Sequence, residues 1–234
     1  MTRSIGAILF GLALLLYAQL TMAGMDYLSG LSEESAIAVD NAAGEVRLLA
    51  VLQPKAFGKG WFTQLPGHHA VTWKGGKKGG EALLSTFASD SAVYDALIGL
   101  GAVPGDNLSQ AVWEERKNPR SKAPDSIVEG TPMDVLVWWQ GLNTPIPLSS
   151  LMLDPGGKGV DLRFGGHMAL VPLWRSGCIV CMQSCPGGRI SNRAYSIRDY
   201  VEGRATFTVN DSVVPEGDRR AVVIIRVKDP VSSR

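Results

Sequence analysis

All three cysteines of this 234-residue chain lie within eight positions, at Cys178, Cys181 and Cys185. Their spacing, C-x2-C-x3-C-P, matches the last three ligands of the bacterial ferredoxin run C-x2-C-x2-C-x3-C-P, whose first cysteine is missing here. Thiols that served only as small apolar side chains would be scattered through the core, so this spacing predicts one shared site. The Pro-Gly-Gly after Cys185 would let the backbone approach a bound group closely.

Three kinds of site fit this segment. Three cysteines can hold three irons of a 4Fe–4S cluster and leave the fourth iron to another ligand. A single zinc or copper ion is the alternative cofactor, since cysteines with one histidine bind zinc and thiolates alone suit Cu(I). A disulfide with one thiol left over is the third interpretation, because an exported chain meets oxidising conditions. The spacing favours the iron–sulfur cluster and leaves the other two open.

Histidines are the candidates for a fourth ligand. His167 lies eleven residues before Cys178 and is the nearest one in the sequence. His68 and His69 can reach the cysteines only through the fold, and alternation along a strand points only one of them at any given face. The sequence therefore names His167 as the first candidate, although a lone histidine is more often hydrogen-bonded than a ligand.

Arginines gather around the cysteines. Residues 163–204 contain six arginines against only Asp199 and Glu202. This surplus would offset the negative charge of a thiolate-ligated site, and Arg163 and Arg189 are the predicted charge-compensating residues. The alternative is that these are solvated side chains balanced by acids elsewhere. Trp174, four residues before Cys178, could shield the site from water.

The first 23 residues are typical of an export signal. Arg3 is the only charge before an apolar run, and Thr21 and Ala23 place small residues at both positions that determine cleavage. We expect residues 1–23 to be a signal peptide and the protein to be periplasmic or in the cell envelope. An uncleaved membrane anchor is the alternative, and it is the only route by which we expect contact with a membrane.

Without residues 1–23 the chain has 22 basic and 22 acidic residues. A neutral chain argues against non-specific binding of nucleic acid, which depends on a basic surplus. No G-x-S-x-G motif is present, and the glycine run at 75–80 lacks the G-K-[ST] end of a phosphate loop. Whether the protein is an enzyme stays open, with no hydrolase or transferase signature to favour it.

The remaining elements predict an α+β fold, mostly β strands and hairpins with one clear helix, and the cysteine loop near the C-terminal third. The helix is expected at 89–100, where apolar residues recur with helical spacing after two serines able to cap it. Residues 24–44 are expected to be a lead-in, 45–228 the domain, with two subdomains divided near 125–145 as an option, and 229–234 a tail. Strands are expected at 45–52, 68–73, 83–87, 133–140, 205–210 and 221–227, with a short helix or strand at 148–153. The pairs 68–73 with 83–87 and 205–210 with 221–227 are expected to form hairpins, and 114–126 an exposed excursion.

Several segments together resemble the YdjY-domain family of small bacterial proteins. They cover roughly residues 45–228, and the cysteine segment with its Arg163-Phe-Gly-Gly lead is the specific part. Members are commonly described as ferredoxin-like because of those cysteines, so the resemblance implies a cysteine-ligated site and names no reaction. An Asn usually follows Arg-Phe-Gly-Gly in the family, whereas this chain has His167. The resembling segments are HHAVTWKGG, YDALIGLGAVPGDN, GTPMDVLVWWQG, DLRFGG, GCIVCMQSCPGG, SNRAY and VVPEGDRRAVVIIRV.

These observations lead to one functional hypothesis and one alternative. The hypothesis is an exported redox or electron-transfer accessory protein, with an iron–sulfur cluster or metal at the cysteines and a redox protein as its partner. The alternative is a non-catalytic binding or structural module stapled by a disulfide in the Cys178–Cys185 loop.

Overall fold

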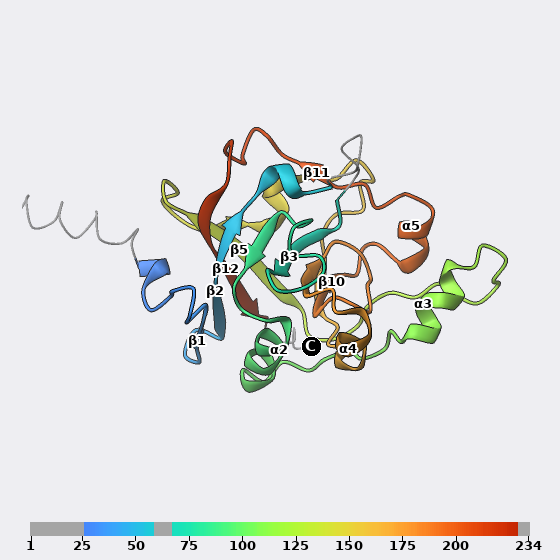
Figure 1. The fold of residues 1–234 in the computed structure, drawn as a ribbon. Coiled ribbons are helices and arrows are strands. Elements are labelled where there is room, and N and C mark those ends of the chain that lie inside the picture. The colour runs from blue at the N-terminus through green and yellow to red at the C-terminus, as the bar shows by residue number, and fades with distance from the viewer. Residues whose placement is uncertain (1–25, 59–66, 229–234) are drawn as a thin grey trace, which may run out of the picture.

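A computed structural model describes residues 26–58 and 67–228 of the chain (Figure 1). The predicted signal peptide and the C-terminal tail 229–234 lie outside the described residues. Within the described ranges, no helix is both long and apolar enough to cross a membrane.

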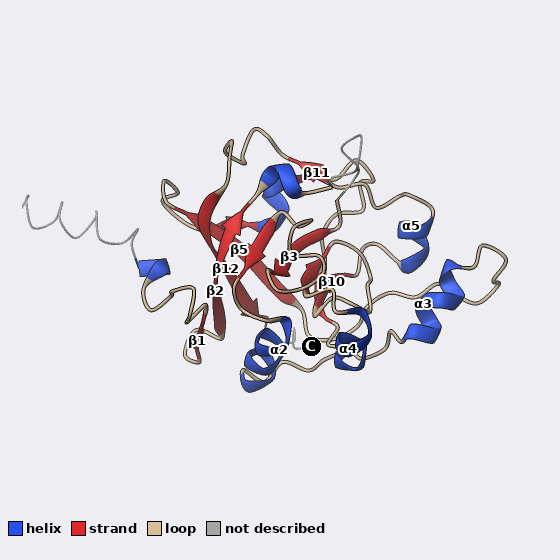
Figure 2. Cartoon of the chain, viewed as in Figure 1, coloured by secondary structure: helices blue, strands red, loops and turns tan. Residues whose placement is uncertain are grey.

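One ten-stranded sheet organises the molecule (Figure 2). It curls back on itself, since a β-bridge joins Pro132, just before one interior strand, to Arg163 on an edge strand. A separate pair is formed by β7 (Met152–Leu153) and β11 (Thr208–Val209). The path of the large sheet runs through β6 (Ile146–Pro147), β5 (Met133–Trp139), β12 (Arg219–Val227), β2 (Glu45–Leu52), β4 (Leu84–Thr86), β3 (His69–Trp73), β9 (Cys178–Cys181), β10 (Ile190–Asn192) and β8 (Leu162–Phe164), with β1 (Ile37–Asp40) also paired to β2.

Short helices lie around the sheet, and α3 and α5 lie together away from its long strands (Figure 1). Ser89 caps α2 (Asp90–Gly99) by accepting a hydrogen bond from the Ala92 amide, as expected, and Gly101 follows in the left-handed region at φ 83°. The others are α3 (Gln110–Lys117), α4 (Val171–Trp174) and α5 (Ile197–Val201), with 3-10 turns η1 (Asp26–Leu28), η2 (Pro54–Ala56), η3 (Leu148–Leu151) and η4 (Met168–Leu170).

The apolar core is centred on β2, β12 and β5. Residues 221–225 of β12 are all completely buried, and this strand pairs with β2 on one side and β5 on the other. Branched residues in an unbroken apolar run suit a strand covered on both faces, which explains the central position of β12. Each fully buried leucine, isoleucine or valine contributes roughly 1.5–3 kcal/mol to the stability of the fold.

The predicted α+β class with a majority of strands is confirmed. Strand 45–52 is found with those bounds, 133–140 is found as β5, and 148–153 contains both η3 and β7. The sheet includes strands from both sides of residues 125–145. The predicted lead-in contains η1 and strand β1. The predicted exposed excursion at 114–126 begins within α3, and most of its residues are exposed or half-buried.

The expected hairpin between 68–73 and 83–87 is wrong, because β3 and β4 pair in parallel. The glycine-rich connection docks against the chain ahead of Cys178 instead of turning tightly: the Lys77 and Lys78 amides donate to the carbonyls of Arg175 and Ser176 at 2.9 and 3.0 Å. A Cβ on Gly76 would meet the Gly177 backbone at 2.5 Å, so this close approach depends on glycine. After the docked loop, β4 runs in the same direction as β3.

The expected C-terminal hairpin is also wrong. β11 pairs with β7, whereas β12 pairs with β2 and β5. The difference in burial explains this. The apolar β12 buries most side-chain surface when it lies between β2 and β5, whereas Thr208 and Val209 of β11 are exposed or half-buried.

Candidate metal centre

Strand pairing places a histidine beside the cysteines. His69 of β3 is directly opposite Cys181 of β9. Residues three apart on a regular strand point to opposite faces, so Cys178 and Cys181 would not share a site on an undistorted β9. The register between β3 and β9 shifts twice, between His69 and Val71 and between Val71 and Thr72. This β-bulge bends the ladder, and both thiols pack in one buried cluster.

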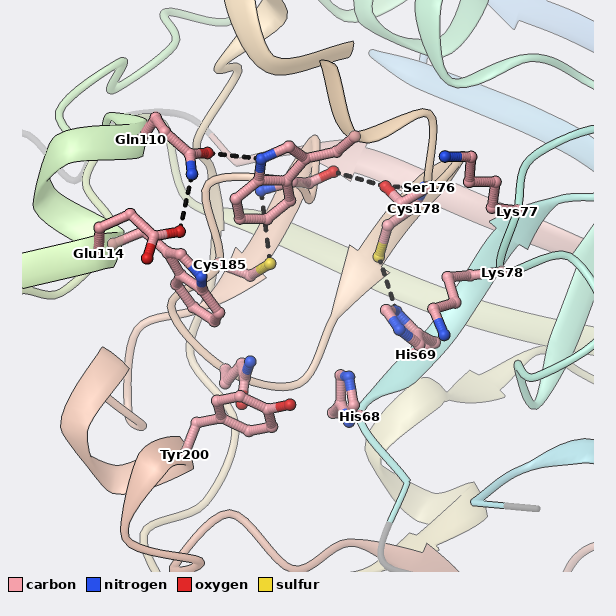
Figure 3. A pocket seen from close by; sticks show the side chains of 14 residues that line it. His68, His69, Lys77, Lys78, Gln110, Glu114, Ser176, Cys178, Cys185 and Tyr200 are labelled. Atoms are coloured by element: carbon pink, nitrogen blue, oxygen red, sulfur yellow. Dashed lines mark hydrogen bonds between the residues drawn. The ribbon is translucent and has the colours of Figure 1, made fainter. Parts of the chain in front are cut away.

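His69, Cys178 and Cys181 have the spacing of metal ligands. Their ligand atoms all lie within 4.8 Å of one another, and the three residues are buried. His69 Nδ1 is 3.4 Å from Cys178 Sγ, as Figure 3 shows. Among the histidine, cysteine, aspartate and glutamate side chains of the described residues, these three form the group whose geometry could hold a metal ion.

Cys185 completes the cysteine cluster from the loop between β9 and β10. Its sulfur accepts a hydrogen bond from the Gly187 amide at 3.4 Å, and the Ser191 hydroxyl donates to its carbonyl at 3.1 Å. A Cβ on Gly187 would meet the Trp174 ring at 2.5 Å, and one on Gly188 would meet the Ser191 hydroxyl at 2.7 Å and Cys181 Cβ at 3.0 Å. The glycines therefore allow the loop to pass between the tryptophan and the thiols.

Trp174 closes the outer side of the cysteine cluster. Its ring packs against the three cysteines, and its indole N–H donates to Gln110 Oε1 at 2.6 Å. The tryptophan is held in place from α3, so the shielding role expected for it has a structural basis.

The Cys181 and Cys185 thiols and the His69 imidazole favour their neutral forms. Hydrogen bonding with Cys178, together with burial, raises the pKa of Cys181 well above its usual range. Hydrogen bonding with Cys181, followed by burial, does the same to the pKa of Cys185. Burial, with His68 and Lys78 adding to it, lowers the pKa of His69 well below 6.5. A neutral imidazole is the form that binds a metal, whereas the thiols must lose protons to do so.

Arg189 lies beside the cysteines, completely buried. Burial lowers its pKa, while charges that include Cys178 and Cys185 raise it. Its guanidinium donates to the Gly187 carbonyl at 3.2 Å and contacts Met168 Sδ at 3.2 Å, and its Nε has no hydrogen-bond partner. Buried Asp90 is the charge that raises this pKa most, ahead of the two cysteines, so the guanidinium would divide its stabilising effect between Asp90 and a thiolate placed next to it.

The other two residues named from the sequence, His167 and Arg163, lie outside the triad. His167 is buried, and its Nε2 accepts a hydrogen bond from the Leu108 amide at 3.1 Å. It is not part of the triad, where His69 takes the position of the nitrogen ligand. Arg163 on β8 is held by its own neighbour, since it donates to both carboxylate oxygens of Asp161 at 2.9 and 3.1 Å.

The cysteines are free thiols in the structure. The alternative of a disulfide staple in the Cys178–Cys185 loop is therefore not what the structure contains. Burial of all three sulfurs beside a histidine favours a metal site over a staple.

A pocket of about 340 Å³ opens onto the site. Cys178, Cys185 and His69 contribute to its wall (Figure 3). The rest comes from α3, α4, α5, the loop before β4, His68, Ser176 and the cysteine-loop residues Gln183 and Gly187. No sequence spacing connects these segments, so Gln183, Trp113 and Tyr200 were not found from the sequence. His68 was found as a candidate ligand and lies in this wall instead of in the triad.

Comparison with known proteins supports the resemblance. The family model of the YdjY domain matches residues 37–226. A relative, Uncharacterized protein YdjY of Escherichia coli (strain K12), is 29% identical over 201 residues, which covers 86% of this chain and 82% of the relative. No solved structure matches the chain.

Proposed function

This chain belongs to the YdjY domain family, and we propose that it binds one thiophilic transition-metal ion through His69, Cys178 and Cys181. Cys185, which lies outside this triad but in the same buried cysteine cluster, is proposed as the fourth ligand. The observation that carries the proposal is the convergence of one imidazole and two thiols within 4.8 Å. When bound, such an ion would crosslink β3, β9 and the cysteine loop, which together form one wall of the pocket.

Distances favour a single ion. Zinc lies about 2.3 Å from sulfur and 2.0–2.1 Å from nitrogen, so two ligands of one tetrahedral ion are separated by roughly 3.5 Å. The 3.4 Å between His69 Nδ1 and Cys178 Sγ matches that edge. In an iron–sulfur cube each thiolate binds a different iron, which separates the ligands further. Three cysteines with one histidine is a ligand set of structural zinc sites.

Charge balance supports the same proposal. A divalent ion with three thiolates and a neutral imidazole carries one net negative charge. Arg189, buried beside Cys178 and Cys185, supplies a positive charge next to it. Asp90 and Asp106 also act on Arg189, so its guanidinium offsets part of the negative charge of the site and lowers the cost of burying it.

The test is the metal content of the full chain purified without air. We expect one metal ion per chain by native mass spectrometry and by elemental analysis. Cys181→Ser and His69→Ala should lose it, whereas His68→Ala, a matched control at the neighbouring position, should keep it. A metal-free wild-type chain after incubation with zinc or copper, or full retention by Cys181→Ser, would overturn the proposal.

An iron–sulfur cluster with an electron-transfer role is the second candidate. It is supported by the packing of all three cysteines in one cluster and by the position of Arg189 beside it. Acid-labile sulfide and several irons per chain, with an electron paramagnetic resonance signal on reduction, would establish the cluster. One metal ion without sulfide would establish the mononuclear site and remove this candidate.

Export and a redox protein partner are proposed for either kind of site. Both come from the sequence, through residues 1–23 and the ferredoxin-like spacing. The mass of the mature chain isolated from its own cells tests export, because cleavage after Ala23 would leave a chain that begins at Gly24. An intact chain starting at Met1 would support an anchor instead.

A further inference from the structure

The pocket beside the cysteines is lined by aromatic rings from four separate segments. Trp174 of α4 contacts Trp113 of α3 at 5.4 Å between ring centroids, and Trp113 stacks on Tyr200 of α5 at 5.8 Å. Tyr200 in turn meets the His68 ring edge-on at 5.1 Å. All four side chains line the pocket, so a flat apolar molecule would meet ring faces or edges on several sides.

Gln183 adds an unused polar atom to this apolar pocket. The residue lines the pocket and is 1% exposed, and its Oε1 has no hydrogen-bond partner. A buried carbonyl oxygen without a donor costs stability, and such groups are normally satisfied in proteins. The oxygen is enclosed in the pocket wall, so an N–H or O–H of a bound molecule would satisfy it after rotation of the side-chain amide.

Charges at the opening differ from one side to the other. Lys77 and Lys78 lie on the side of Cys178 and His69, and Gln110 and Glu114 lie on the opposite side, as Figure 3 shows. Lys78 is partly neutralised by Glu81 at 2.7 Å, whereas Lys77 has no carboxylate partner among the described residues. The lysine side therefore has a surplus of positive charge suited to an anionic group.

We infer that this pocket binds a small, flat aromatic carboxylate that also carries a hydrogen-bond donor. The ring would lie among Trp113, Trp174 and Tyr200, the donor would reach Gln183 Oε1, and the carboxylate would lie at Lys77 and Lys78. Nothing in this inference requires a bound metal. Its failure would leave the proposed metal site untouched, and loss of the metal site would leave the pocket to be tested by itself.

The test uses indole-2-carboxylate, a probe that has all three features. Isothermal titration calorimetry of the full chain, with and without added zinc, should show saturable binding of one probe per chain. Indole, which lacks the carboxylate, and 1-methylindole-2-carboxylate, which lacks the N–H donor, should each bind more weakly, by roughly tenfold for the charged contact. Hexanoate, an aliphatic carboxylate, should show no saturable binding.

Variants separate the contacts. Exchanging both lysines (Lys77→Gln with Lys78→Gln) should weaken the binding of indole-2-carboxylate and leave the binding of indole unchanged. The control Lys122→Gln, at an exposed lysine away from the pocket, should change neither affinity. Gln183→Leu should remove the preference for the N–H probe over the N-methyl probe. It should also raise the unfolding temperature, because it removes an unpaired buried oxygen.

Two results would overturn the inference. One is the absence of saturable binding of indole-2-carboxylate by the wild-type chain. The other is equal binding of the N–H and N-methyl probes by the wild-type chain, a comparison that needs no variant to fold. An unchanged affinity in the double lysine variant would contradict the assigned position of the carboxylate.

Discussion

The two halves of the sheet are built in different ways. Around β12 the strands are long, the pairing with β2 and β5 is regular, and residues 221–225 are completely buried. Around β9 the strands are three to five residues long and the pairing with β3 is bulged twice. The buried side chains there include thiols, His69, Gln183 and Arg189, and the last two retain polar atoms without partners.

The comparison shows a division of labour between the halves. The regular half gains its stability mainly from apolar burial, and its two unpartnered buried polar atoms, Arg219 Nε and Ser85 Oγ, lie at the end of β12 and on the short strand β4. The bulged half gives up regular pairing, and the bulge is what brings Cys178 and Cys181 to one side. Irregular pairing is a cost that folds commonly keep at functional sites. Loss of a metal ligand, a core substitution and a change of pH should therefore affect the stability of the two halves differently.

The largest effect is expected from removal of a metal ligand. With free metal a thousandfold above its dissociation constant, the bound ion should stabilise the wild-type chain by about 4 kcal/mol. Cys181→Ser should lose this metal-dependent gain, because it removes the central thiol of the site. Denaturant unfolding of both chains with and without zinc measures it, and an equal gain in the two chains would contradict the assigned ligand.

A core variant should break the regular half without affecting the site. Leu48 of β2 is completely buried and lies opposite Val223 of β12. Leu48→Ala should lower the free energy of unfolding by about 3 kcal/mol through lost burial and the cavity left behind. The loss should be the same with and without zinc, and metal stoichiometry should not change. A loss of metal in this variant would show that the halves are coupled.

A glycine variant tests the packing of the cysteine loop. Gly188→Ala would place a Cβ 2.7 Å from the Ser191 hydroxyl and 3.0 Å from Cys181 Cβ, so we expect a loss of roughly 1–3 kcal/mol in stability. Metal affinity should fall with it, because Cys181 has to move. Gly80→Ala is the matched control, since a Cβ there has nothing within 4 Å. Similar unfolding curves for the two variants would argue against a tightly packed loop.

The smallest effect concerns acid stability near α5. Burial by itself would raise the pKa of Asp199, but Lys158, the Ser196 amide and Arg204 lower it from 3.8 to about 2. Because the folded pKa is the lower one, the contribution is fully present above pH 4 and is lost as the pH falls towards 2. It should amount to about 1 kcal/mol, since Lys158 and Arg204 are half-exposed. Unfolding of the metal-free chain between pH 5 and 2 measures it, and Asp199→Asn should not show the change.

Local features of the sequence were enough for the elements of the regular half. Strand β2, helix α2 with its Ser89 cap and the interior strand β5 follow from apolar runs, helical spacing and capping chemistry, which act between near neighbours. Pairing was harder, because neither the parallel β3 and β4 nor the separation of β11 from β12 is visible in a window of neighbouring residues. Those partners depend on where a loop docks and on which strand gains most from burial.

The sequence by itself determined that the three cysteines form a group and that the chain resembles the YdjY domain family. Only the tertiary structure decided which nitrogen joins them. His167 is nearer in the sequence, but its Nε2 accepts from the Leu108 amide, whereas the register of β3 against β9 brings His69 opposite Cys181. The pocket could not be predicted from the sequence either, because its wall comes from segments that only the fold brings together. A site made of side chains from several elements depends on long-range packing, which spacing along one chain does not encode.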